Sequence, residues 1–174
     1  NFTPGASAAT IEIALRHPIK LIVNALGSPP AELVQRAHAS GIKVAAMAGA
    51  SKHAIKHRDA GCDFVIAVGT EAGGHTGSTT SMVLWPRIVD AVAPLPVLGA
   101  GGIGRGRQLA AALALGCEGA WCGSVWLKTV QSEVTPEQAI LWWGQGRTRV
   151  ERVRAKEFLT YPVGQIVADM REET

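Results

Sequence analysis

Short apolar runs alternate with amphipathic segments along most of the chain. Each run is bounded by glycine or polar turn residues, and most are followed by apolar residues at helical spacing. The five runs are Leu21–Leu26, Lys43–Ala48, Phe64–Val68, Pro96–Ala100 and Gly119–Cys122. They are apolar throughout rather than alternating, so we expect strands that are covered on both faces. This pattern is typical of a parallel sheet.

The segments between the runs carry signals for helix ends. Ser28 stands where a helix N-cap belongs, with Pro29 at the first helical position and Gly41 at the end. The apolar face of this helix is expected to be Leu33, Val34 and Ala37. Similar signals predict helices from Ser51 to Gly61, around Leu84–Val92, from about Arg105 to Leu115 and over Pro136–Trp143.

Strand–helix units in succession fit both a parallel barrel and an open doubly wound sheet. Polar, glycine-rich segments follow the third, fourth and fifth runs, at the strand ends where barrel enzymes keep their active sites. We therefore predict an α/β fold, a (β/α)8 TIM barrel, as a single domain over residues 1–174. A complete barrel usually needs 200 residues or more, so we expect about the last five units, with the N-terminal strands missing. A gap within Gly146–Phe158 would explain the unclear pattern there.

Composition narrows the class of protein. Of the 174 residues, 47% are hydrophobic, which suffices for one packed core, and the net charge is +3. That charge suits an anionic ligand but is too small to indicate nucleic acid. No apolar stretch is long enough for a membrane span, and the first residues do not resemble a signal peptide. The three cysteines fit reduced thiols, so we expect a cytoplasmic protein without a metal site.

Two glycine-containing turns are candidates for binding a phosphate. Gly101 and Gly102 lie between the fourth run and the next helix, and Gly123 and Ser124 follow the fifth run. Glycines let the backbone approach a ligand, and free N–H groups at a helix start favour an anion. In barrels these would be the standard phosphate loops after strands seven and eight. The alternative is a pair of tight turns that bind nothing.

The segment Gly69–Gly77 is a candidate for the reacting centre. His75 has glycines on either side that could fold the loop over a flat ligand. Imidazole titrates near neutral pH and can accept a proton from carbon. A single histidine in a glycine loop is more often exposed and idle, but two phosphate loops nearby favour a catalytic role.

These motifs, in this order, resemble the nitronate monooxygenase family, formerly called 2-nitropropane dioxygenases. The resemblance is carried by Glu71–Gly77, Ala100–Ile103, the alanine-rich helix ending at Gly116, and Gly123–Ser124, with a weaker match at Tyr161–Ile166. It implies FMN as cofactor and oxidation of alkyl nitronates or nitroalkanes with O2 to a carbonyl compound and nitrite. FMN phosphate would lie on Gly101, Gly102, Gly123 and Ser124, the isoalloxazine near Ala72, Gly73 and Gly74, and His75 would be the catalytic base.

The chain departs from the family's sequence pattern at one place, and two other functions stay possible. Family members commonly have a basic or small residue and Phe after the second phosphate motif, where this chain has Val125 and Trp126. NAD(P)H-dependent flavin enoyl-acyl-carrier-protein reductases share the motifs, so that activity stays open. The alternative outside the enzymes is a barrel that binds a phosphorylated ligand without catalysing a reaction.

Other polar or aromatic clusters have simpler explanations. The basic cluster Lys52, His53, Lys56, His57 and Arg58 is expected on a solvated helix face, because no third metal ligand of the usual kind is nearby. Cys117 and Cys122 are expected to be buried thiols. Trp126, Trp142 and Trp143 are expected in packing or in a homodimer contact, and the arginines of 147–154 in a solvated segment.

Overall fold

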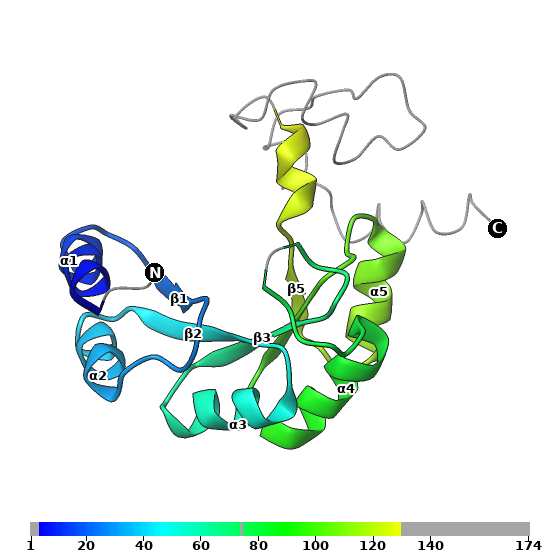
Figure 1. The fold of residues 1–174 in the computed structure, drawn as a ribbon, viewed down its shortest axis with the longest axis horizontal. Coiled ribbons are helices and arrows are strands. Elements are labelled where there is room, and N and C mark those ends of the chain that lie inside the picture. The colour runs from blue at the N-terminus through cyan, green and yellow to red at the C-terminus, as the bar shows by residue number, and fades with distance from the viewer. Residues whose placement is uncertain (1–3, 74, 130–174) are drawn as a thin grey trace.

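The computed structural model describes residues 4–73 and 75–129. Five parallel strands hydrogen-bond in sequential order, as Figure 1 shows. The strands are β1 (Leu21–Asn24), β2 (Lys43–Ala48), β3 (Phe64–Val68), β4 (Val97–Ala100) and β5 (Gly119–Trp121). A doubly wound sheet would reverse its strand order at a switch point. Sequential order therefore confirms the barrel-type arrangement, here as a curved, five-stranded part of a barrel.

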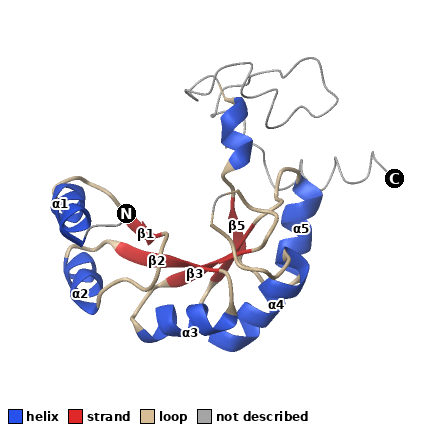
Figure 2. Ribbon diagram, in the orientation of Figure 1, coloured by secondary structure: helices blue, strands red, loops and turns tan. Residues whose placement is uncertain are grey.

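Helices alternate with the strands; those between strands lie along the outer side of the curved sheet, and the last one extends beyond the end of the fifth strand (Figure 2). They are α1 (Pro4–Leu15), α2 (Ala31–Ala39), α3 (Ser51–Asp59), α4 (Ser81–Val92), α5 (Gly106–Ala114) and the 3-10 helix η1 (Ser124–Lys128). The sequence did not predict α1, because its apolar residues are not gathered on one face and give no periodic signal. In the described part of the chain, no helix is long and apolar enough to cross a bilayer.

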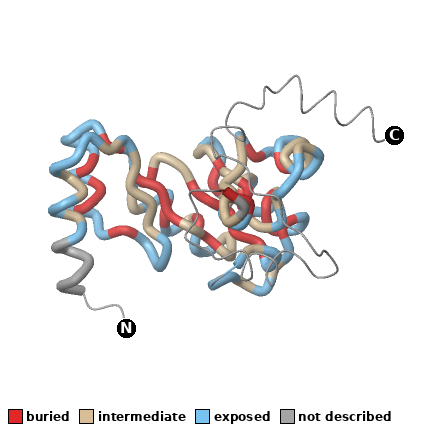
Figure 3. Tube along the Cα trace, turned by 90° about the horizontal axis from the view of Figure 1, so that it is seen from above, coloured by how far each residue is buried: buried red, intermediate tan, exposed pale blue. Residues whose placement is uncertain are grey.

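Strands β1 to β4 each contribute to two apolar layers, and β5 contributes Trp121 to the inner one. Outward-facing residues such as Val44, Val65 and Val97 are buried under the helices, together with Trp85 and Ile88 of α4. The inward-facing layer consists of Ala45, Ile66, Val68 and Ala100, packed against half-buried neighbours that include Leu21, Phe64, Leu98 and Trp121. Figure 3 shows the buried stretches as red parts of the tube, interspersed with exposed and intermediate ones. The apolar runs thus reflect two covered faces, as predicted.

Helix ends were predicted better than helix starts. Gly41, Gly61 and Gly116 end α2, α3 and α5 with left-handed φ values of 69°, 89° and 91°. Ser28 is not the N-cap of α2, because the helix begins at Ala31 after Pro30. Its hydroxyl instead lies 2.9 Å from Nδ1 of His57.

His57 corrects the prediction of a solvated basic helix face. It is 2% exposed, and its Nε2 lies 3.0 Å from the carbonyl oxygen of Met47. Because that carbonyl can only accept, Nε2 donates to it, while Nδ1 pairs with the Ser28 hydroxyl. His57 therefore ties α3 to β2 and to the loop before α2. Burial lowers its pKa, although the bond to Met47 acts in the opposite direction.

Candidate functional site

The three predicted site segments follow β3, β4 and β5 directly and so lie at one edge of the sheet. The strand register pairs Val68 with Ala100, and Ala100 with Trp121. Adjacent strands lie about 4.8 Å apart. The segment after Val68, the glycines after Ala100 and the turn after Trp121 are consequently neighbours. Figure 1 shows this edge, from which the chain continues past β5 into η1.

The turn after β4 has the properties of an anion-binding backbone. Gly101 and Gly102 have φ values of 104° and 75°, a region that favours glycine. Among residues 4–73 and 75–129, no hydrogen-bond acceptor is found for the N–H groups of Gly101, Gly102 and Ile103. Consecutive unpaired N–H groups at a strand end are suited to an oxyanion.

The start of α5 itself differs from the sequence prediction. The N–H groups of Gly104 and Arg105 both donate to Oε1 of Gln108, at 2.8 Å each. They are therefore not the free donors that we expected at this helix start. Within residues 4–73 and 75–129, the backbone donors of this turn without an acceptor are those of Gly101, Gly102 and Ile103, just before this helix start.

The turn after β5 is open. Gly123 is exposed, and a Cβ added to it would meet none of the described residues within 4 Å. Ser124 is exposed and is the first residue of η1. Trp126 fixes this short helix, because its Nε1 donates to the carbonyl oxygen of Cys122 at 2.7 Å. Gly123 and Ser124 are thus exposed residues in the turn that follows the strand paired with β4.

The loop after β3 has an ordered base and an open tip. At the base, Ala72 N donates to the Gly69 oxygen and Thr70 N to the Thr79 oxygen, both at 3.1 Å. Ala72 also packs against the inward-facing layer of the sheet. At the tip, Gly73 has open space beside its Cα, and His75 is exposed. Gly74 lies outside the described residues.

Glu71 and Ser81, which the sequence analysis did not assign a role, anchor this loop. The Glu71 carboxylate accepts from Ser81 N at 3.1 and 2.9 Å and from Ser81 Oγ at 2.8 Å. Burial raises the pKa of Glu71, but the Ser81 hydrogen bonds outweigh burial and leave the pKa below its ordinary value. Glu71 therefore acts as a charged cap on α4. Its position ten residues before the helix it caps explains why no local motif identified it.

A second anchor joins the far side of the loop to the end of β2. Gly49 and Gly77 are in backbone contact: a Cβ on Gly49 would lie 2.8 Å from Gly77 N. A Cβ on Gly77 would overlap the carbonyl oxygen of Gly49. The segment that carries His75 is therefore hydrogen-bonded to α4 through Glu71 at one end and packs closely against Gly49 at the other.

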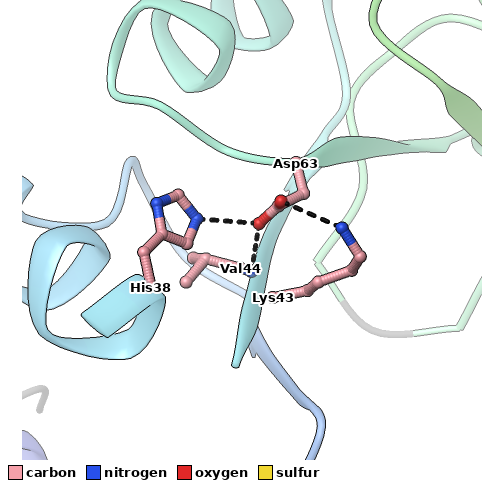
Figure 4. Close-up of polar contacts among 4 residues, drawn as sticks. All are labelled: His38, Lys43, Val44 and Asp63. Atoms are coloured by element: carbon pink, nitrogen blue, oxygen red, sulfur yellow. Dashed lines mark hydrogen bonds and ion pairs between the residues drawn. The ribbon is translucent and has the colours of Figure 1, made fainter. Parts of the chain in front are cut away.

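A polar cluster around Asp63 lies at the opposite edge of the sheet (Figure 4). Its carboxylate accepts from Val44 N at 2.7 Å, from His38 Nε2 at 2.9 Å and from Lys43 Nζ at 3.2 Å. These groups belong to β2 and α2, and Asp63 immediately precedes β3. Polar residues at this end of a barrel contribute to stability rather than chemistry. In the described part of the chain, no group of side chains could hold a metal ion.

Cys117 is buried, as predicted, whereas Cys122 is only half-buried. Burial raises the pKa of Cys117 to about 11, so it is an unreactive thiol. The helix predicted at Pro136–Trp143, Trp142 and Trp143, the 147–154 arginines and the Tyr161–Ile166 match lie outside the described residues.

Comparison with known proteins identifies the family. The model of the family described as nitronate monooxygenase matches residues 2–157. A Mycobacterium tuberculosis protein named "Putative monooxygenase Rv1533" is 56% identical over 78% of this chain and 36% of its own length. A Rhodococcus jostii protein named "(3aS,4S,5R,7aS)-5-hydroxy-7a-methyl-1-oxo-octahydro-1H-indene-4-carboxyl-CoA dehydrogenase" is 42% identical over 71% of this chain and 35% of its own.

Among solved structures, nitroalkane oxidase from Streptomyces ansochromogenes superimposes with a TM-score of 0.72 and 33% identity. That match covers 78% of this chain and 42% of the oxidase. The chain thus spans about a third of the length of the curated relatives and under half that of the solved one. The match of the family model over most of the chain shows that this protein belongs to the nitronate monooxygenase family.

Proposed function

We propose that the protein is an FMN-dependent oxidoreductase that oxidises alkyl nitronates or nitroalkanes with O2 to a carbonyl compound and nitrite. The observation that carries the proposal is the pair of neighbouring turns after β4 and β5. One presents left-handed glycines whose N–H groups have no acceptor among the described residues, and the other presents an exposed serine. Family membership and the likeness to a nitroalkane oxidase support the reaction class.

The residues present fit the phosphate of FMN. Gly101 and Gly102 would bind it through the backbone, Gly123 would leave room for it, and Ser124 would donate its hydroxyl. The open space beside Gly73 fits close approach of a planar ring, and Ala72, Gly73 and Gly74 are our assignment for the isoalloxazine. When bound, FMN would supply the electron transfer between the nitronate and O2.

His75 would serve as the proton acceptor. A neutral nitroalkane must lose a proton from carbon before it can donate electrons as a nitronate, and an imidazole can accept that proton. His75 is carried on the loop whose ends are fixed by Ser81 and by Gly49. A preformed nitronate needs no such step, so it bypasses the histidine.

Substitution of His75 tests this role in the full protein. His75→Ala should lower kcat/KM for nitroethane by a factor of about 100 or more, the usual range of general-base catalysis. Turnover of ethyl nitronate should change far less. His53→Ala is the matched control, because His53 is also exposed but lies on α3. Equal losses with both substrates would count against the base role.

A second candidate reaction is supported by the relative named as a CoA-thioester dehydrogenase. On the same barrel, a flavin enzyme could exchange hydride between NAD(P)H and an enoyl thioester, such as an acyl-carrier-protein substrate. Anaerobic mixing with NADH and NADPH separates the two candidates. Rapid bleaching of the flavin would favour the reductase, whereas inertness would favour nitronate oxidation. A colourless protein that ignores added FMN would instead favour a barrel that binds another phosphorylated ligand.

A further inference from the structure

We infer that Glu71, through its contact with Ser81, is a positioning residue that sets the geometry of the His75 loop and of the β4 phosphate turn together. The inference rests on the proposed function, because it assigns a role within the same site. Its structural part concerns only residues of this chain and can be measured without a flavin.

The first support is that one carboxylate fixes both the loop and the helix that follows it. Glu71 lies four residues before His75, whereas Ser81 is the first residue of α4. The contacts between them are 2.8–3.1 Å long and charge-assisted. Ser81 is 4% exposed, so its backbone N–H group cannot readily find water as a substitute acceptor if the carboxylate is removed.

The second support is that the same pair contacts the β4 turn. Ser81 Oγ lies 3.1 Å from the carbonyl oxygen of Gly101. A Cβ on Gly101 would lie 3.0 Å from Ser81 Oγ, and a Cβ on Gly102 would lie 3.2 Å from Cβ of Glu71. The Glu71–Ser81 pair therefore fills the space between the histidine loop and the phosphate turn.

The third support is steric and comes from Gly69, the residue that directly follows β3. A Cβ on Gly69 would lie 2.6 Å from Ser81 N and 2.7 Å from Glu71 Oε2. Gly69, Gly101 and Gly102 are thus required by the Glu71–Ser81 pair, in addition to any ligand that approaches them. This explains why glycines and an acidic residue occur together at the ends of two adjacent strands.

The charge distribution also has a functional consequence. The carboxylate takes the N–H group and hydroxyl of Ser81 at the start of α4, so an anion is excluded from that helix start. The N–H groups of Gly101–Ile103 have no acceptor in the part of the chain that the structure describes. Glu71 thereby directs a phosphate to the β4 and β5 turns and keeps it away from the base of the histidine loop.

The experiment compares Glu71→Ala, Glu71→Gln and Ser81→Ala with Asp63→Asn in the full protein. Asp63 is the matched control, since it is also a carboxylate with several hydrogen bonds but lies at the other edge of the sheet. Three quantities are measured: amide hydrogen exchange of residues 69–81 in the apoprotein, the Kd for FMN, and the ratio of kcat/KM for nitroethane to that for ethyl nitronate.

Glu71→Ala should accelerate amide exchange at Ser81 by about tenfold and raise the Kd for FMN by about tenfold. It should also lower the ratio of kcat/KM for nitroethane to that for ethyl nitronate by about tenfold. Ser81→Ala should change all three quantities in the same direction. Glu71→Gln should recover most of each change, because the amide oxygen can still accept from Ser81 N. Asp63→Asn should lower stability without altering exchange at 69–81 or the substrate ratio.

The inference is overturned if Glu71→Ala behaves as Asp63→Asn does in exchange and in the substrate ratio. A wild-type protein that binds no FMN, or that oxidises neither substrate, would refute the proposed function instead. In that case, exchange at Ser81 and at residues 75–77 still decides whether Glu71 sets the loop. Unchanged exchange in Glu71→Ala would then overturn the inference as well.

Discussion

The contact between Gly49 and Gly77 gives the sharpest prediction about the architecture of the site. Replacing Gly77 by alanine puts a methyl group onto the carbonyl oxygen of Gly49. Both partners are backbone, so neither can move aside by changing a rotamer. Gly73→Ala is the control in the same loop, because a Cβ there meets nothing within 4 Å and its φ is outside the left-handed region.

The expected magnitude follows from this geometry. Overpacking costs about 1–3 kcal/mol in a well-packed site, and a clash with immovable backbone belongs at the upper end, about 2–3 kcal/mol. Gly49→Ala should cost a similar amount, because its Cβ would lie 2.8 Å from Gly77 N. The double variant should cost less than the sum, since the loop has already moved. Gly73→Ala should stay within about 0.5 kcal/mol of wild type or be slightly stabilising.

Urea unfolding of the apoprotein measures these free energies, and titration with FMN measures the Kd of each variant for the cofactor. Gly77→Ala should lose stability and also bind FMN more weakly, because the His75 loop is displaced. Gly73→Ala should keep its stability but still weaken FMN, if the isoalloxazine passes this residue. A Gly77→Ala protein as stable as wild type would show that the two loops are not in contact and would refute the reasoning.

Three further predictions concern single residues. Burial lowers the pKa of His57 in the folded protein, so the wild type should lose stability as pH falls from about 6.5 toward that lowered value. His57→Gln should remove this pH dependence. Parallel pH dependences of the two proteins in urea unfolding would contradict this. Burial raises the pKa of Asp63, but its hydrogen bonds outweigh burial and lower the pKa overall. Asp63→Asn should therefore lower the free energy of unfolding by about 1–3 kcal/mol at neutral pH. This difference should shrink as pH falls through the lowered pKa of Asp63. Thermal melts at pH 7 and pH 3 check that sign. Gly101→Ala should destabilise the apoprotein by about 1–3 kcal/mol, because the φ of Gly101 is 104° and an added Cβ would meet Ser81 and Gly69. Equal unfolding midpoints for the variant and the wild type would refute this prediction.

The strand ends could be predicted from the sequence because their signals are local. Apolar runs located all five strands to within two residues at each end, and Gly41, Gly61 and Gly116 marked three helix ends. Sequential glycine-rich segments also placed the candidate site at the carboxyl edge. These features depend on residues that are neighbours in the chain, so periodicity and turn chemistry reveal them.

The contacts that hold the site together could not be predicted, because they join distant segments. Ser28 looked like a helix cap, yet it bonds to His57, which lies 29 residues away. Glu71 looked like an ordinary member of a loop motif, although it caps a helix ten residues later. A polar residue chooses among such partners only when the fold brings them together, and a single sequence contains no record of that choice.

The central claim is that the turns after β4 and β5 bind one phosphate group. The most direct measurement is the affinity of the apoprotein for FMN and for riboflavin, which differ only by that group, in wild type and in Ser124→Ala. We expect FMN to bind wild type at least about a hundredfold more tightly than riboflavin, and Ser124→Ala to weaken FMN about tenfold while leaving riboflavin unchanged. Equal affinity for the two flavins, or a Ser124→Ala variant that weakens both alike, would contradict the account.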